Sequence, residues 1–228
     1  MCEQPINVHA LKQIQSDIIR YSPYPKLVNI IAVTKNFNIT AIQSAVENNI
    51  YQIGENRVQE YSKKITDSNY EKQIESHLIG KLQTNKVNKA VGLFDTIQTV
   101  DSLRLAEKIN NRAQIINMCQ CIFVQINIGS DPNKGGFLLN GVYREIEKIQ
   151  KLEHIHLLGV MTILPLGLTP KKTQTLFKAT KDIQLKVQKT ISPTCKFVSM
   201  GMSGDYIAAL KEGSTHIRIG TKLYGQRK

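Results

Sequence analysis

A single lysine follows one of the most apolar segments of this sequence. Lys35 comes directly after the run 27–34, Leu-Val-Asn-Ile-Ile-Ala-Val-Thr, which has the character of a buried strand. In a barrel of parallel strands, the carboxyl ends of the strands carry the chemistry. An amine held there can lose its proton through burial and condense with an aldehyde or a ketone. For this segment alone, a lysine that marks the exit of the strand into solvent is the simpler interpretation.

Two later segments combine small residues with hydroxyl groups, as phosphate-binding loops do. The first contains Ser199 and Met200 and follows a short apolar pair, and the second is Gly220-Thr221, directly after the predicted strand 215–219. Hydroxyl groups and backbone amides that glycine leaves accessible both suit an anion, as does the N-terminus of a following helix. One such loop is common before any helix, but the loops after strands seven and eight of a barrel form a recurrent phosphate site.

An arginine lies inside the strand 215–219. Alternation places His216, Arg218 and Gly220 on one face of that strand. A buried guanidinium is costly unless it is paired, so either a structural ion pair or a ligand contact accounts for Arg218. A ligand with a phosphate at one end and an aldehyde at the other would reach Lys35, Arg218 and both loops. Pyridoxal 5′-phosphate has this shape.

Eight apolar segments alternate with amphipathic ones and would position these residues. Such an alternation, with strands apolar on both sides, indicates a parallel sheet covered by helices. Eight strands favour closure into a (β/α)8 barrel, in one domain spanning residues 1–228. The alternative is a doubly wound open sheet, although the first turn, 34–37, lacks the glycines of a dinucleotide site. The expected strands are 27–35, 51–53, 77–79, 94–100, 121–128, 155–161, 197–198 and 215–219, and the better-defined helices are 4–21, 40–48, 83–91, 101–113, 138–152, 171–189 and 203–213.

Composition limits the classes of partner. The formal net charge is +12, from 30 Lys and Arg against 18 Asp and Glu, which suits a nucleic acid or an anionic small ligand. The lysines are scattered, aromatic residues make up 6% of the chain and tryptophan is absent, so no stacking platform for nucleic acid is visible. The apolar runs are only strand-sized, so no membrane-spanning helix is expected.

The cysteines and histidines show neither a disulfide pattern nor a metal pattern. The four cysteines are Cys2, Cys119, Cys121 and Cys195. They form no C-x-x-C pair, and the N-terminus shows no secretory signal, so we expect a cytoplasmic protein. His154 and His156 can share a strand face, but zinc needs three or four converging ligands and no others lie nearby. We therefore expect no metal site.

Several segments together match a known family along nearly the whole chain. The chain resembles the pyridoxal phosphate homeostasis proteins, whose barrel is like the N-terminal domain of alanine racemase. The order and joint occurrence of these segments are specific, whereas no single segment is. The chain departs from residues that are frequent in the family at Ser76, Lys81 and Gly204. The matching segments are 32–35, 54–60, 77–86, 159–163, 199–203 and 213–221.

This resemblance implies a cofactor and the residues that hold it. Lys35 would bind pyridoxal 5′-phosphate as an internal aldimine, Arg218 would face the pyridine nitrogen, and Asn56 would lie at the edge of the site. An arginine at that place would leave the nitrogen largely unprotonated and weaken the ring as an electron sink. The groups implied to hold the phosphate are Ser199, the amide of Met200, Gly220 and Thr221.

The resemblance also bears on whether the protein is an enzyme. Alanine racemase-like enzymes use a second acid/base from an additional C-terminal domain, and here the chain ends at Lys228, soon after the last predicted strand. We therefore expect no catalytic residues, and a monomeric protein that buffers, delivers or sequesters pyridoxal phosphate and contacts pyridoxal phosphate-dependent enzymes transiently. A pyridoxal phosphate-dependent amino-acid racemase, or a Schiff-base lyase acting through Lys35, is the alternative.

Overall fold

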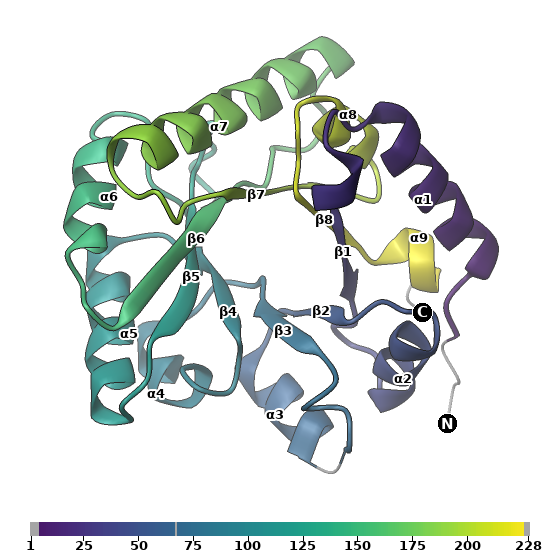
Figure 1. The fold of residues 1–228 in the computed structure, drawn as a ribbon, viewed down its shortest axis with the longest axis horizontal. Coiled ribbons are helices and arrows are strands. Elements are labelled where there is room, and N and C mark those ends of the chain that lie inside the picture. Colours follow the sequence, from purple (N-terminus) through teal and green to yellow (C-terminus); the bar gives the residue numbers. More distant parts are fainter. Residues whose placement is uncertain (1–4, 67, 226–228) are drawn as a thin grey trace.

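The computed structural model describes residues 5–66 and 68–225, which contain a closed barrel of eight parallel strands. The strands are β1 Asn29–Val33, β2 Gln52–Glu55, β3 Glu75–Leu78, β4 Thr96–Val100, β5 Gln120–Gln125, β6 Ile155–Met161, β7 Phe197–Met202 and β8 His216–Ile219. They follow one another around the barrel in chain order, and β8 closes it by pairing with β1 (Figure 1). The (β/α)8 barrel is therefore confirmed and the open sheet is excluded.

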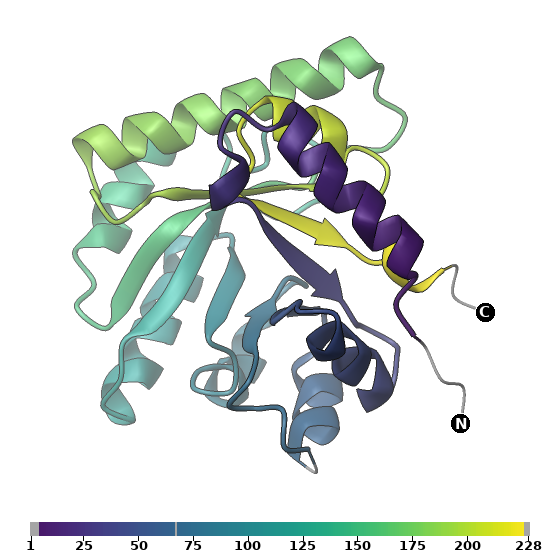
Figure 2. The same cartoon turned by 45° about the vertical axis from the view of Figure 1, so that its right-hand side comes forward.

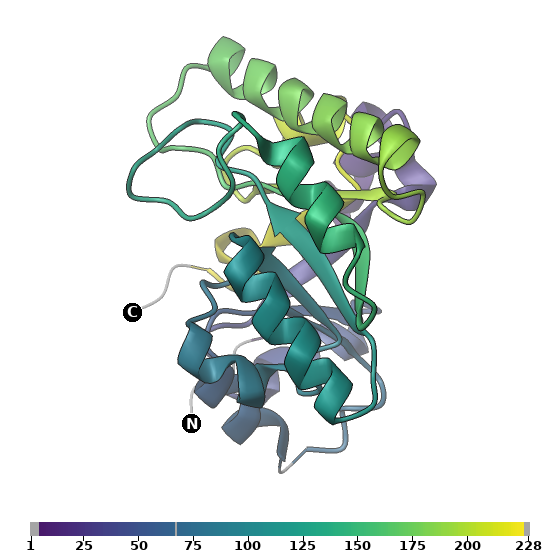
Figure 3. The same cartoon turned by 90° about the vertical axis from the view of Figure 1, so that its left-hand side faces the viewer.

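Helices connect the strands and surround the barrel. The helices are α1 Val8–Tyr21, α2 Ile39–Glu47, α3 Val58–Thr66, α4 Val87–Ala90, α5 Leu103–Ile115, α6 Val142–Gln150, α7 Pro170–Thr190, α8 Tyr206–Lys211 and α9 Thr221–Tyr224, with the short 3-10 helices η1 Pro25–Leu27 and η2 Thr84–Lys86. The long helix α7 and the helix α1 lie over the same side of the barrel, with α8 between them (Figure 2). On another side α5 and α6 pack against each other (Figure 3). Within the described parts of the chain, no helix combines the length and apolar character that a membrane crossing requires.

Capping residues determine where several helices begin. Thr169 accepts a hydrogen bond from the backbone of the first turn of α7, and Pro170 is the first helical residue, where its missing N–H costs nothing. The sequence also suggests Asp101 as the residue that caps α5, and this prediction is wrong by one residue. The hydroxyl of Ser102 accepts from the amide of Leu105 at 3.3 Å and caps α5 instead.

Other helix limits differ from the expected ones for local reasons. The helix α1 begins at Val8, because Asn7 caps it with a hydrogen bond from the third residue along; the expected start near Gln4 lies outside the described residues. The expected helix 83–91 is divided into η2 and α4. The expected helix 138–152 is shorter, because Gly141, with φ of 83°, precedes the first helical residue of α6.

The inner face of the barrel carries many polar residues, contrary to the expectation of strands that are apolar on both sides, although Phe123 and Phe197 also pack on His216 there. His77 and His216, from β3 and β8, approach each other inside it, with ring centroids 6.1 Å apart. The inner face also carries Gln98, Ser199 and Arg218, which are joined by hydrogen bonds. The face toward the helices is apolar and buried, and includes Ile53, Ile97, Val124 and Ile217. The expectation therefore holds for the outer face and only in part for the inner one.

Candidate functional site

A cavity of about 310 Å³ lies at the carboxyl ends of the strands. This volume falls at the lower end of the range of roughly 300–1,000 Å³ that is typical of small-molecule sites. Its lining comes from both halves of the barrel, from β1 to β3 and from β6 to β8. The lining residues are Val33, Lys35, Asn56, Ile79, Ile163, Met202, Ser203, Gly204, Arg218, Gly220 and Thr221.

Five of the seven residues that the sequence suggested line this cavity. They are Lys35, Asn56, Arg218, Gly220 and Thr221. The structure therefore brings together an amine, a guanidinium, an amide and a hydroxyl group from the ends of three strands, β1, β2 and β8. Ser199 and Met200 lie deeper, within β7, and both are buried.

A bulge in β7 explains this difference. The sequence predicts a strand that ends at Val198, but β7 continues to Met202. Along it Ser199 pairs with His216, and Met202 pairs with Arg218. An advance of three residues on β7 therefore matches an advance of two residues on β8, which is the mark of a bulge. The strand therefore carries its loop beyond Ser199, and Met202 reaches the cavity.

Gly201 makes this bulge possible. Its φ is 92°, in the left-handed region, and a Cβ at this position would lie 2.6 Å from the Cβ of Ala209 in α8. Only glycine fits both the backbone conformation and the close approach of α8. In the sequence, a glycine after a short apolar pair resembles the start of a loop, and the bulge leaves no clearer signal.

The sequence reasoning missed Ser203 and Gly204 as cavity residues. The sequence suggests Ser203 as the cap of the expected helix 203–213, but α8 begins only at Tyr206. Its side chain instead bridges the two loops, because its Oγ accepts a hydrogen bond of 3.3 Å from the amide of Lys222. The hydroxyl-bearing residue that follows β7 and faces the cavity is thus Ser203, four positions beyond Ser199.

Lys35 lies on a tight turn immediately after β1. The turn is closed by a hydrogen bond of 3.1 Å from the amide of Phe37 to the carbonyl of Thr34. Asn36 adopts φ of 64°, a left-handed conformation that asparagine tolerates better than most residues. The lysine is partly buried, and the turn fixes the direction in which its backbone faces the cavity.

A buried ion pair supports this turn from the helix side. The ammonium of Lys64, from α3, pairs with Glu55 at the end of β2 and donates to the carbonyl of Thr34 at 2.9 Å. The hydroxyl of Thr34 donates to Glu55 at 2.6 Å. Burial raises the pKa of Glu55, and the charge of Lys64 opposes that rise. The strand end that carries Lys35 is therefore held by a charge pair that solvent does not reach.

Arg218 is a buried cation with neutral partners. Its Nη1 donates to Ser199 Oγ and its Nη2 to the carbonyl of Thr162, each at 2.8 Å. None of the ion pairs among the described residues includes it. Burial lowers the pKa of Arg218 to about 10, and the charge of Asp205 opposes this shift. The guanidinium is thus protonated at neutral pH and lines the cavity without a carboxylate in contact.

Asn56 lies where two loops meet. A Cβ on Gly80 would lie 2.3 Å from the carbonyl oxygen of Asn56, so the loops after β2 and β3 touch through their backbones. The hydroxyl of Thr99 fixes the same place, because it donates to the carbonyl of Gly80 at 2.8 Å. Asn56 is therefore presented to the edge of the cavity by a rigid pair of loops.

Known proteins of similar sequence and structure agree with this geometry. The family described as alanine racemase, N-terminal domain, matches residues 6–228. A pyridoxal phosphate homeostasis protein of Synechocystis is 37% identical over 94% of this chain and 97% of its own length. The structure of PipY from Synechococcus elongatus with pyridoxal phosphate bound is 35% identical, covers 95% of this chain and 99% of that one, and has a TM-score of 0.85. Alanine racemase of Clostridium difficile, 19% identical with a TM-score of 0.72, covers 98% of this chain and 57% of that one, and shows the fold alone.

Proposed function

This chain belongs to the family of pyridoxal phosphate homeostasis proteins, and we propose that it binds pyridoxal 5′-phosphate reversibly through Lys35 and maintains the supply of that cofactor by holding and releasing it. The observation that carries the proposal is the convergence of Lys35 and Arg218 with the hydroxyl groups of Ser203 and Thr221 around one cavity. An amine, a cation and two phosphate-binding hydroxyl groups match the aldehyde, the ring and the phosphate of this cofactor.

Lys35 supplies the amine. The aldehyde of the cofactor condenses reversibly with a primary amine, which is the chemistry that the group supplies when bound. The turn at 34–37 and the ion pair of Glu55 with Lys64 hold the backbone of Lys35 at the cavity wall. The chain therefore presents its amine from a fixed point on β1, rather than from a mobile surface loop.

The phosphate end belongs at the loops after β7 and β8. Ser203 and Thr221 contribute hydroxyl groups there, and Gly204 and Gly220 have no side chain that would keep an anion from the backbone. The hydroxyl of Ser199 is already engaged with Arg218 and Gln98. We therefore assign Ser203, in place of Ser199, to the phosphate.

Arg218 sets the electronic state of the bound ring. A guanidinium has donors and no acceptor, so toward a pyridine nitrogen it can only donate. A nitrogen that accepts this hydrogen bond stays unprotonated, and an unprotonated ring withdraws electrons weakly. This environment favours storage of the cofactor over carbanion chemistry.

The cavity lining also favours a role without turnover. Racemisation needs a second positioned acid or base within hydrogen-bond reach of the reacting carbon. Among the described residues that line the cavity, the titratable ones are Lys35 and Arg218. Neither a carboxylate nor a histidine is present there to act as the second base. We propose that the protein is not an efficient enzyme, and that pyridoxal phosphate-dependent enzymes are its transient partners.

Titration of the purified chain with pyridoxal phosphate tests this function. We expect a saturable absorbance band shifted from that of the free cofactor, and its loss in the Lys35→Ala variant. Lys86→Ala is the matched control, because Lys86 is another partly buried lysine near the same end of the barrel that does not line this cavity. An unchanged spectrum at saturating cofactor would contradict the proposal.

Assays with amino acids distinguish the proposed binding function from the alternative enzymatic activities. The loaded protein should not interconvert the enantiomers of alanine or other amino acids at an ordinary enzymatic rate. Sustained turnover at roughly 1 per second or more would establish a racemase instead. Cleavage of a sugar phosphate by the cofactor-free protein would establish a Schiff-base lyase.

A further inference from the structure

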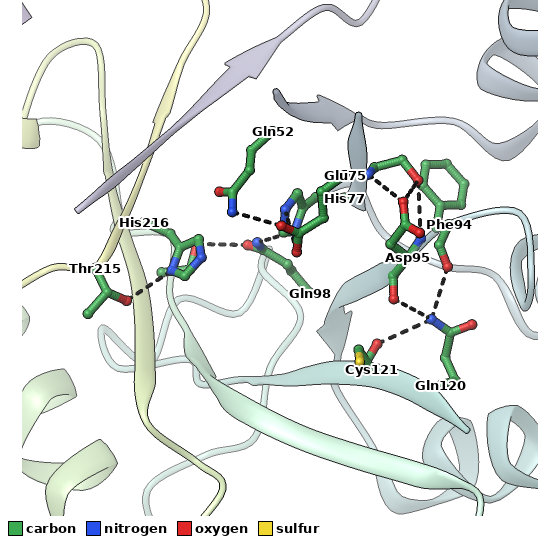
Figure 4. Close-up of polar contacts among 12 residues, drawn as sticks. Gln52, Glu75, His77, Phe94, Asp95, Gln98, Gln120, Cys121, Thr215 and His216 are labelled. Atoms are coloured by element: carbon green, nitrogen blue, oxygen red, sulfur yellow. Dashed lines mark hydrogen bonds and ion pairs between the residues drawn. The ribbon is translucent and has the colours of Figure 1, made fainter. Parts of the chain in front are cut away.

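A chain of buried polar side chains runs through the barrel beneath the cavity. It begins at Arg218 on β8, passes through Ser199 and Gln98, and reaches His77 on β3. Ser199 Oγ is 2.7 Å from Gln98 Oε1, and Gln98 Nε2 is 3.0 Å from His77 Nδ1. Figure 4 shows the amide of Gln98 extended toward His77, with Glu75 beyond it. All four members from Arg218 to His77 are buried.

The donor-only character of Arg218 fixes the direction of this chain. Because Arg218 donates to Ser199 Oγ, that hydroxyl is free to donate its own proton onward to Gln98 Oε1. The amide nitrogen of Gln98 then faces His77 and donates to Nδ1. Since Nδ1 must accept, neutral His77 carries its proton on Nε2.

The other end of His77 leads independently to the same tautomer. Its Nε2 lies 3.3 Å from Glu75 Oε1, although without the geometry of a full hydrogen bond. A proton on Nε2 is attracted to that carboxylate, whereas a lone pair there would be repelled by it. In the opposite direction Ser199 Oγ would accept from both Arg218 and Gln98, and its own proton would have no acceptor among the hydrogen bonds of the described residues. Both ends of the chain therefore favour one arrangement.

The surroundings keep His77 neutral. The side chains that face it inside the barrel are Gln98 from β4 and His216 from β8, with Glu75, which accepts a hydrogen bond from Gln52, at the amino-terminal end. Burial, with a smaller contribution from His216, lowers the pKa of His77 well below its ordinary value. A neutral imidazole can accept at Nδ1, as the chain requires.

We propose that His77 and Gln98 are positioning residues for the cofactor site, which orient Arg218 toward the ring of the ligand through Ser199. This inference rests on the proposed function for the identity of the ligand, but the hydrogen-bond chain exists without it. Loss of the acceptor at His77 frees the amide of Gln98 to rotate. Ser199 then loses its fixed acceptor and can rotate away from Nη1 of Arg218, which keeps only its hydrogen bond to the carbonyl of Thr162 as a fixed contact.

Nitrogen NMR of the imidazoles in the cofactor-free protein is the first test. We expect His77 at neutral pH to show an unprotonated Nδ1 and a protonated Nε2. A proton on Nδ1, or a doubly protonated ring, would overturn the proposal. This outcome does not depend on cofactor binding, so it is distinct from a failure of the proposed function.

Matched variants provide the second test. His77→Leu should raise the dissociation constant of pyridoxal phosphate roughly tenfold, the effect of one lost hydrogen bond, and should shift the absorbance maximum of the bound cofactor. His77→Asn, which retains an acceptor close to the Nδ1 position, should restore both values. His216→Leu is the control, because His216 is equally buried but bonds to Thr215 outside the chain.

The control also separates positioning from general stability. His216→Leu should lower the melting temperature about as much as His77→Leu, and should leave the dissociation constant within about twofold of the wild-type value. Equal weakening of binding by both leucine variants would assign the effect to general loss of packing and overturn the proposal. Wild-type binding and an unshifted maximum in His77→Leu would overturn it as well. If His77→Leu does not fold, two other results decide the question. They are the dissociation constant of His77→Asn relative to the wild type, and the tautomer of His77 measured by NMR.

Discussion

The Nη1 group of Arg218 donates a hydrogen bond of 2.8 Å to Ser199 Oγ inside the barrel, below the cavity floor. This contact engages the serine that the sequence suggested for a phosphate and leaves Ser203 as the hydroxyl that follows β7 at the cavity. Arg218 and Ser199 therefore form one hydrogen-bonded unit inside the barrel. The proposed phosphate site lies above it, in the loop that contains Ser203.

The two serines should respond differently to substitution. Ser203→Ala removes a hydroxyl from the cavity wall and should weaken pyridoxal phosphate binding roughly tenfold, with little change in the free energy of unfolding. Ser199→Ala leaves buried donors on Arg218 without an acceptor and should lower that free energy by about 1–3 kcal/mol. Titration and urea unfolding of both variants check this. If Ser203→Ala binds normally and is destabilised, our assignment of the two hydroxyl groups is reversed.

Gly201 should tolerate no side chain. Gly201→Ala places a Cβ in the left-handed region and against Ala209, and we expect a loss of about 1–3 kcal/mol in the free energy of unfolding. Gly204→Ala is the control three residues along, because its added Cβ meets no atom within 4 Å. Urea unfolding of the pair measures the difference. Equal stability of the two variants would show that the bulge in β7 is not constrained as described.

The buried ion pair behind Lys35 should show strong coupling. Lys64→Met leaves the Glu55 carboxylate buried without its partner and should cost about 3–5 kcal/mol, whereas the double variant with Glu55→Gln should recover much of that loss. The control is Lys148→Met, which breaks a solvent-exposed pair with Glu145 and should cost less than about 1 kcal/mol. A double-mutant cycle by urea unfolding checks the coupling. If the losses in unfolding free energy of the two single variants simply add in the double variant, the two buried charges do not depend on each other.

The buried histidines predict a dependence of stability on pH. Burial, and to a smaller extent Arg218, lowers the pKa of His216 to about 4. The unfolded chain therefore takes up a proton as the pH falls below about 6.5 while the folded protein does not, and stability is lost between about pH 6.5 and 4. For His216 the loss approaches roughly 3 kcal/mol at pH 4.

A comparison of wild type with His216→Asn isolates this effect. The raised pKa values of Glu55 and Glu75 act in the opposite direction, since the folded protein then holds protons more tightly than the unfolded chain, but they are common to both proteins. The difference in unfolding free energy between the wild type and His216→Asn should become smaller as the pH falls from 7 to 4. A constant difference across that range would contradict the assignment of a neutral, buried His216.

The sequence predicted the barrel well, because buried apolar residues such as Ile53, Ile97, Val124 and Ile217 lie on the side of most strands that faces the helices. The strand at 155–161 was predicted at its observed limits, since its apolar residues lie between polar positions at both ends. The polar inner face was missed, because residues such as His77 and Gln98 are satisfied only by partners on other strands. No local pattern distinguishes them from strand-end residues.

Most of the candidate site could also be predicted, because Lys35, Arg218 and the pair Gly220-Thr221 lie directly at strand ends. The exception is Ser203, which lies at the cavity because of the bulge at Gly201. That bulge depends on the close approach of α8, which the sequence does not reveal. A strand that continues past a glycine in the left-handed region cannot be distinguished from a loop by sequence spacing. This is why Ser199 was suggested where Ser203 lies at the cavity.

Borohydride reduction of the protein loaded with pyridoxal phosphate, followed by peptide mass spectrometry, tests the central claim most directly. We expect the reduced cofactor on a single peptide at Lys35, and none on that peptide in Lys35→Ala. Reduction that traps the cofactor on other lysines while Lys35 stays unmodified would contradict the account.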